Sequence, residues 1–212
     1  MYKYVPKENR KNNRFPDNKI STYVRSLRND HKYKYDTNMT NVLNKVEKSC
    51  VYYPNEFEQT FERTIFNNLL KELKGLEGQC SEVAWSKHFK IENPKLLSTF
   101  NMIIDKLASK FNVDVVETRL NYYPDETTWK PLHQDRHAYD DVKEDFTMGA
   151  SFGETRYLLF HHIETDKEFK VPQNNGDVFA FNSEINKLFQ HGIVKASKCG
   201  PRFSIIAWGR LK

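Results

Sequence analysis

Cysteine is scarce in this sequence of 212 residues, which contains only Cys50, Cys80 and Cys199. An odd number of cysteines without a C-x-x-C spacing argues against a disulfide framework and against a thiolate zinc site. Long apolar runs are also missing: none approaches the ~18 residues of a membrane-spanning helix, and the first residues lack the apolar segment of a signal peptide. We therefore expect an intracellular protein, cytoplasmic or nuclear, that is monomeric and makes no contact with membranes.

Acidic residues are scarce at one end of the chain only. Residues 1–49, here called the N-terminal arm, hold 12 Lys or Arg and 5 Asp or Glu, a balance of +7; residues 50–212 hold 21 and 23, a balance of −2. The arm shows no sustained helical or strand period, which predicts a basic, mostly irregular segment. Its tyrosines lie among the basic residues, a pattern that suits contact with the phosphates and bases of DNA or RNA. The alternative is a solvated tail whose aromatics rest on the domain.

Two amphipathic helices are predicted at the start of the domain, residues 50–212. The first runs from Asn55, a candidate N-cap, to Gly75. The second begins at Asn93, with Pro94 in the first turn, and ends near Phe111. Their apolar stripes consist of Phe57, Phe61, Ile65, Leu69 and Leu73 in the first helix and of Leu97, Phe100, Ile104, Leu107 and Phe111 in the second.

Short segments rich in β-branched and aromatic residues follow, separated by turn residues. The expected strands lie within residues 113–123, 145–153, 155–163, 168–171, 176–181, 188–194 and 202–209. Helices followed by such strands predict an α+β fold, namely a double-stranded β-helix (a jelly roll) with two or more supporting N-terminal helices.

His133 and Asp135 form an H-x-D triplet in the segment "WKPLHQDRHAYD". On an extended chain their side chains point to the same face and can bind one ion, although such triplets also arise by chance. Iron(II) oxygenases bind their metal through two histidines and one carboxylate. The missing histidine should lie on a later strand, and His191, directly before Gly192, fits best. The alternative is an ordinary core or surface histidine.

Arg202 follows His191 and begins the last expected strand. A guanidinium suits the distal carboxylate of 2-oxoglutarate, because it forms paired, charge-assisted hydrogen bonds. Ser204 lies on the same strand face and offers a hydroxyl to that carboxylate. A lone strand arginine more often makes a surface ion pair, but the order of the H-x-D triplet, His191 and Arg202 favours an oxygenase.

Three segments, "LNYYPDETTWKPLHQD", "GDVFAFNSEINKLFQHGI" and "GPRFSIIAWGR", resemble the AlkB-like branch of the 2-oxoglutarate- and Fe(II)-dependent dioxygenases. The resemblance covers roughly residues 115–210. It implies Fe(II) bound by the two histidines and the aspartate, 2-oxoglutarate and O2 as co-substrates, and ascorbate as reductant in vitro. It also assigns Asn121 and Tyr123, which match an N-x-Y pattern, to co-substrate binding.

Two positions depart from the pattern of this family. A second arginine normally lies six residues after the first; that position is Trp208 here, and Arg210 either substitutes for it or is exposed. Nucleic-acid dealkylases of the family usually carry an acidic residue two positions after the metal-binding aspartate, where this chain has His137. The second departure concerns the substrate rather than the oxygenase chemistry.

The expected function is hydroxylation or demethylation of an N-alkylated base in DNA or RNA by the domain, with the basic arm tracking phosphates. Candidates for substrate contact are His137, Tyr139, Trp129 and Trp85, each of the aromatics being more often a packing residue. Two other interpretations stay open: a hydroxylase or demethylase of a protein side chain or small molecule, and a non-catalytic jelly-roll module.

Overall fold

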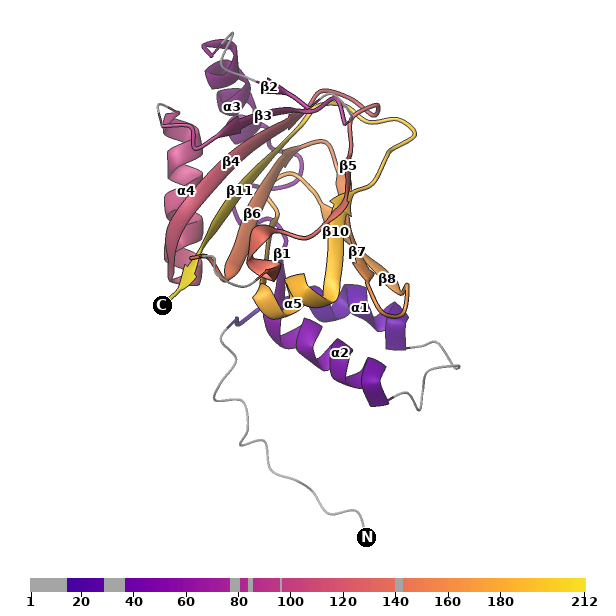
Figure 1. The fold of residues 1–212 in the computed structure, drawn as a ribbon. Coiled ribbons are helices and arrows are strands. Elements are labelled where there is room, and N and C mark those ends of the chain that lie inside the picture. Colours follow the sequence, from indigo (N-terminus) through magenta and orange to yellow (C-terminus); the bar gives the residue numbers. More distant parts are fainter. Residues whose placement is uncertain (1–14, 29–36, 77–80, 84–85, 96, 140–142) are drawn as a thin grey trace.

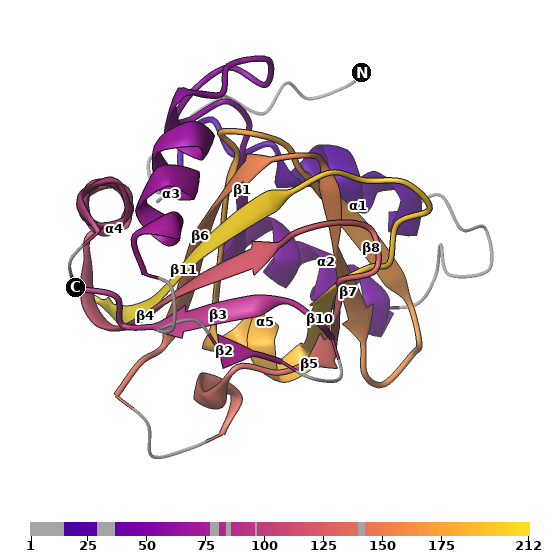
Figure 2. The ribbon, with the colours of Figure 1, turned by 90° about the horizontal axis from the view of Figure 1, so that it is seen from above.

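Two antiparallel sheets form the body of the molecule (Figures 1 and 2). The computed structural model describes residues 15–28, 37–76, 81–83, 86–95, 97–139 and 143–212. The larger sheet has the order β1 (Cys50–Tyr53), β9 (Val178–Asn182), β6 (Phe146–Gly153), β11 (Arg202–Leu211), β4 (Val113–Tyr123), β3 (Phe89–Glu92) and β2 (Ser81–Glu82). The smaller has the order β5 (Lys130–His133), β10 (Phe189–Ile193), β7 (Arg156–His162) and β8 (Glu168–Gln173).

The predicted jelly roll is confirmed, and each of the seven expected segments forms a strand: β4 and β6 to β11. The strands β1, β2, β3 and β5 were not expected. Each has four residues or fewer, too short for an alternating pattern to stand out from the surrounding loop.

Strand β11 shows how the larger sheet separates two cores. Phe203, Ile205 and Ala207 point to one face and pack in the cluster beneath the helices α3 (Thr64–Lys74) and α4 (Ser98–Phe111). Ser204, Ile206 and Trp208 alternate with them and face the space between the two sheets. This period of two is the pattern expected of a strand covered on both faces.

Both predicted helices begin later than expected, because carboxylates from outside each helix accept hydrogen bonds from the backbone N–H groups of its first turn. Helix α3 starts at Thr64, where the Glu58 carboxylate accepts a hydrogen bond from the Ile65 N–H at 3.1 Å. Helix α4 starts at Ser98, and Glu72 of α3 accepts bonds from its first turn, including the Thr99 N–H at 2.7 Å. Asn55 and Asn93 therefore do not cap these helices, and Phe61 is exposed. The apolar stripe predicted for the second helix is buried throughout.

The prediction of a mostly irregular N-terminal arm is wrong for two stretches. Helices α1 (Ile20–Arg28) and α2 (Thr37–Ser49) pack beside α5 (Ser183–Leu188) and β8 (Figure 1). Their buried residues, Ile20, Val24, Met39, Leu43 and Val46, join the core between the sheets. These positions are three or four residues apart, a helical spacing, but the surrounding polar residues concealed it. The division of the chain at residue 49/50 remains a prediction.

Replacing Leu43 with Ala tests whether α2 belongs to the core. Leu43 is 5% exposed, and a Leu-to-Ala change in a core costs about 2–5 kcal/mol of the free energy of unfolding. Denaturant unfolding measures this, with the exposed neighbour Asn44→Ala as the matched control, for which a change within about 0.5 kcal/mol is expected. Equal stability of the two variants would show that α2 does not contribute to the packed domain.

In the part of the chain that the structure describes, no helix has the length and apolar character needed to cross a membrane.

Candidate metal centre

His133 and His191 lie directly opposite each other on the neighbouring strands β5 and β10. Their ring centroids are 4.4 Å apart, and Asp135 follows β5 with Oδ1 3.7 Å from Nε2 of His133 and Oδ2 3.6 Å from Nε2 of His191. One ligand atom from each of the three residues lies within 4.8 Å of the others. Two imidazoles and one carboxylate converging in this way form the donor set of a facial iron(II) site.

A second layer of residues holds Asp135 in place. The Thr147 hydroxyl of β6 donates to its Oδ2 at 2.8 Å. Asn186 of α5 donates to the Asp135 carbonyl at 2.9 Å and accepts from the Asp135 N–H at 3.0 Å. Such contacts orient a metal ligand and raise its affinity for the ion. Sequence reasoning missed Thr147 and Asn186, because only folding brings them to the H-x-D triplet.

The protonation states suit metal binding. Burial lowers the pKa of His191 to about 4, and burial together with the neighbouring His191 lowers the pKa of His133 to about 3. Burial acts to raise the pKa of the Asp135 carboxyl, but the charges of His191, Lys130 and His133 outweigh it and hold that pKa below its usual range. At neutral pH the three groups are two neutral imidazoles and a carboxylate, the forms that bind a metal.

A cavity between the two sheets adjoins this cluster. It contains about 380 Å³ of space free of protein atoms, part of which is open to solvent. Its lining comprises Asn121, Tyr123, Lys130, His133, Asp135, Thr147, Leu158, Phe179, His191, Gly192, Ile193, Ser204, Ile206 and Trp208. The structure thus brings the expected metal ligands together with three of the residues expected to bind the co-substrate.

Arg202 is fully buried at the start of β11, paired in register with Tyr123. Its Nε donates to the Ser151 hydroxyl at 2.9 Å, and its guanidinium carbon lies 5.4 Å from the centre of the Tyr123 ring. Burial lowers its pKa to about 10, so the group stays charged at neutral pH. Both terminal nitrogens, Nη1 and Nη2, have no hydrogen-bond partner among the described residues. A buried charge with two free donors fits a carboxylate, which accepts two parallel bonds.

Asn121 and Ser204 lie opposite each other on β4 and β11, on the face of the sheet that carries Arg202. The Asn121 amide nitrogen donates to the Ser204 carbonyl at 3.4 Å, and its buried Oδ1 has no partner among the described residues. Tyr123 is 1% exposed and stacks on His88 at 5.0 Å. Asn121, Tyr123 and Ser204 all line the cavity, and their role in binding the co-substrate stays a prediction.

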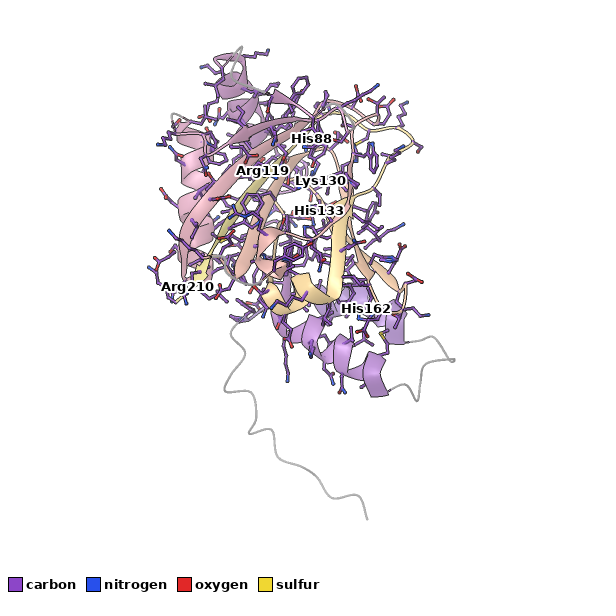
Figure 3. All side chains as sticks on the ribbon, viewed as in Figure 1. His88, Arg119, Lys130, His133, His162 and Arg210 are labelled. Atoms are coloured by element: carbon purple, nitrogen blue, oxygen red, sulfur yellow. The ribbon has the colours of Figure 1, made fainter. Side chains whose placement is uncertain are left out.

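Arg210 is not among the residues that line this site. It lies exposed near the far end of β11, eight residues from Arg202, which corresponds to about 26 Å along a strand. Figure 3 shows it at the edge of the molecule, well away from His133. Arg210 is absent from the lining of both hollows at the metal-ligand candidates, so the structure gives no support to a role of Arg210 as the family's second arginine.

His137 does not face a substrate pocket. The ring is 2% exposed, and its nitrogens lie 2.8 Å from the Ser183 hydroxyl and 2.6 Å from the Thr147 hydroxyl. Because Thr147 gives its only proton to Asp135, Nε2 of His137 must donate to Thr147. His137 therefore supports a metal-ligand candidate from behind, and its expected contact with substrate is wrong.

The aromatic candidates for substrate contact lie outside the inner cavity. Tyr139 is 63% exposed. Trp129 is half-buried, with the Lys195 ammonium 4.8 Å from its ring centre. Trp85 lies outside the described residues. Their roles remain predictions.

A second hollow also adjoins the cluster. It shares His133, Asp135 and Trp208 with the inner cavity. Its remaining lining residues are charged or polar: Glu117, Arg119, Gln134, Arg136 and Glu144. The metal-ligand candidates thus line two hollows, and the second of these is lined mainly by charged and polar residues.

Comparison with known proteins identifies relatives of this arrangement. The sequence pattern of the 2OG-Fe(II) oxygenase superfamily matches residues 12–205. A prolyl-4-hydroxylase from Pseudomonas putida superposes with a TM-score of 0.55 at 14% identity, covering 81% of this chain and 98% of its own. The structure of OsALKBH1 superposes with a TM-score of 0.57 at 13% identity, covering 76% and 96%. No curated protein sequence gives a significant match.

Proposed function

The chain belongs to the 2OG-Fe(II) oxygenase superfamily, and we propose that it hydroxylates or demethylates an N-alkylated base in DNA or RNA. It is an Fe(II)- and 2-oxoglutarate-dependent dioxygenase whose cofactors are Fe(II), 2-oxoglutarate and O2. This membership removes the support for a non-catalytic module. The class of substrate and the roles of the individual site residues are what we propose.

In this proposal His133, Asp135 and His191 hold the iron. Their convergence within 4.8 Å is the observation that carries the assignment. The carbonyl of Pro131, 2.9 Å from Nδ1 of His133, fixes that ring with Nε2 toward the cluster. When bound, Fe(II) and 2-oxoglutarate would activate O2, which supplies the oxidising equivalents for removing hydrogen from a substrate C–H bond.

Arg202 binds the distal carboxylate of 2-oxoglutarate in the proposal. The two guanidinium nitrogens without a partner provide the paired donors, and Tyr123 and Ser204, the strand neighbours of Arg202 in register and along β11, line the cavity that holds the metal-ligand candidates. Tyr123, Ser204 and Asn121 surround the co-substrate and limit its orientations. The enclosed sheet interior excludes water from the reacting groups.

The prime substrate is proposed to enter through the charged outer hollow, which reaches His133 and Asp135. The co-substrate residues Asn121, Tyr123 and Ser204 line only the inner cavity. In this proposal substrate and co-substrate therefore reach the metal ligands through different hollows. A base would have to enter singly, flipped out of its stack.

The basic arm supports a nucleic-acid substrate. Its helices α1 and α2 pack on the domain, and Lys45 of α2 pairs with Glu184 of α5 at 2.9 Å. The described helices of the arm are therefore part of the packed domain, and the arm as a whole carries a balance of +7. Phosphate binding there would hold a nucleic acid on the enzyme.

Hydroxylation of a protein side chain is the second candidate function. The superposition with a prolyl-4-hydroxylase is nearly as good as that with OsALKBH1, with TM-scores of 0.55 and 0.57. The fold therefore does not decide between the two substrate classes. Dealkylases of the AlkB-like branch carry an acidic residue at the position of His137. In this chain the His137 ring is hydrogen-bonded to Thr147, which in turn is hydrogen-bonded to Asp135.

Mass spectrometry of products separates these candidates. The full chain, with Fe(II), 2-oxoglutarate and ascorbate, is incubated with N-methylated DNA and RNA oligonucleotides and, separately, with proline-containing peptides. The proposal predicts that an oligonucleotide becomes lighter by one methylene (~14 Da), with release of formaldehyde. A gain of one oxygen in a peptide, without any change in the oligonucleotides, would establish the second candidate instead. Reactions without 2-oxoglutarate are the control.

The salt dependence of oligonucleotide binding tests the role of the arm. Changing Lys3, Lys7, Arg10, Lys11 and Arg14 to Gln removes five charges from the arm. We expect weaker binding and a log–log salt slope reduced by nearly one unit for every phosphate that the arm no longer neutralises. A matched variant removes five exposed charges outside the arm, by changing Lys71, Lys74, Lys87, Lys170 and Lys198 to Gln. Equal slopes for the two variants would exclude a specific role of the arm.

A further inference from the structure

Lys130 is a cation in the cavity wall that the site described above does not use. Its side chain lines the cavity together with Tyr123 and His133, and Figure 3 shows it beside His133 in the space between the sheets. Within the described part of the chain, its ammonium group forms no hydrogen bond and no ion pair. Burial lowers its pKa to about 8, partly offset by the charge of Asp135, so it is mostly protonated at neutral pH. A desolvated charge is normally paired, so Lys130 is placed to bind an anion.

A β-bulge turns Lys130 toward the cavity. His133 pairs with His191 and Lys130 with Ile193, so two residues of β5, Pro131 and Leu132, lie opposite the single residue Gly192 of β10. The extra residue puts Lys130, three positions before His133, on the same face as that histidine.

The packing of the bulge requires the glycine opposite. A Cβ at Gly192 would lie 2.6 Å from the Lys130 carbonyl oxygen and 2.8 Å from that of Pro131. Leu132 points outward and is 36% exposed. Residues of both strands thus accommodate the bulge, and the bulge turns the Lys130 side chain toward the proposed metal ligands.

The position of Lys130 selects among possible anions. Lys130 lines the inner cavity but not the outer hollow, so its partner arrives from the co-substrate side. Of the two carboxylates of 2-oxoglutarate, the distal one is assigned to Arg202. Arg210 does not line the cavity, and Lys130 is the one lysine or arginine among the described residues of its wall.

We infer that Lys130 binds the carboxylate at the keto acid end of 2-oxoglutarate and so fixes that end beside the metal ligands. The inference rests on the proposed function. It makes Lys130 a co-substrate-binding residue and gives each carboxylate its own cation. Fe(II) carries two positive charges and Asp135 one negative charge, so the metal site would itself attract an anion. The charge of Lys130 would add to this attraction and favour the anionic keto acid over water.

Calorimetric titrations with two keto acids test this assignment. The full chain is loaded with Mn(II), which accepts the same ligand types as iron, and is titrated without oxygen with 2-oxoglutarate or with pyruvate. Pyruvate has the keto acid end but lacks the distal carboxylate. Lys130→Met should weaken both ligands by tenfold or more, whereas Arg202→Ala should weaken 2-oxoglutarate only. Lys170→Met removes the same charge from an exposed site on β8 and should change neither affinity.

Each other result has a defined meaning. Unchanged affinity of Lys130→Met for both ligands overturns the inference, and weaker binding of 2-oxoglutarate alone assigns Lys130 to the distal carboxylate, which also contradicts it. Lys130→Arg keeps the charge and should recover part of the affinity. An unchanged Mn(II) stoichiometry and melting temperature show that the variants are folded. A wild-type chain that binds Mn(II) but neither keto acid overturns the proposed function itself.

Discussion

His191→Ala is expected to abolish stable iron binding, lowering the metal content from about one Fe(II) per chain to near zero. The change removes one of three ligands from a site in which His133 and Asp135 alone would leave the ion open to water. Conversion of 2-oxoglutarate to succinate should disappear with the metal. Metal analysis after anaerobic loading with Fe(II) and removal of excess ion measures the effect.

His162→Ala is the matched control for this experiment. His162 is also a buried histidine, and it lies on β7 in register with Phe189, two residues from His191. Its Nδ1 bonds to the Thr165 hydroxyl at 2.9 Å, and the ring is not part of the metal-ligand cluster. The control should lose some stability but keep its iron. Equal iron contents in both variants would remove His191 from the ligand set.

Arg202→Ala is expected to raise the Kd of 2-oxoglutarate strongly while the iron content stays near one per chain. Removing one partner of a buried, charge-assisted pair costs about 2–5 kcal/mol, which corresponds to about 30-fold or more in Kd. Arg202 contacts no member of the metal cluster; its resolved hydrogen bond goes to Ser151. Anaerobic titration with 2-oxoglutarate measures the Kd.

Arg210→Ala is the control for the second arginine. It removes the same side chain from the exposed end of the same strand, so its Kd for 2-oxoglutarate should equal that of the wild type. A large drop in affinity in Arg210→Ala together with normal affinity in Arg202→Ala would reverse the roles assigned to the two residues.

The sequence predicted what depends on local pattern. Seven strands could be predicted from the pattern of their apolar residues. The period of two along the last of them, β11, also predicted that Arg202 and Ser204 lie on the same face of the sheet. The proposed metal ligands could be predicted because iron(II) oxygenases bind their metal through two histidines and one carboxylate, and the H-x-D triplet and His191 supply these residue types. The structure pairs His133 with His191 across two strands that are far apart in sequence.

Features that depend on distant contacts were missed. Glu58 and Glu72 satisfy helix starts from outside the helices, so the local cap signals at Asn55 and Asn93 were misleading. Lys130 lies three positions from His133, an odd spacing that on a regular strand places two side chains on opposite faces. Only the bulge opposite Gly192 reverses this, and it involves the strand β5, which the sequence analysis did not predict.

The most direct test of the account follows the visible absorption of the Fe(II)-loaded chain during anaerobic titration with 2-oxoglutarate. A charge-transfer band appears when the keto acid chelates iron, so the band reports that metal and co-substrate occupy one site. The account predicts a band that saturates at one 2-oxoglutarate per iron in the wild type. It predicts no band in His191→Ala, and in Arg202→Ala a band only at far higher 2-oxoglutarate. A band of wild-type size and midpoint in both variants would contradict it.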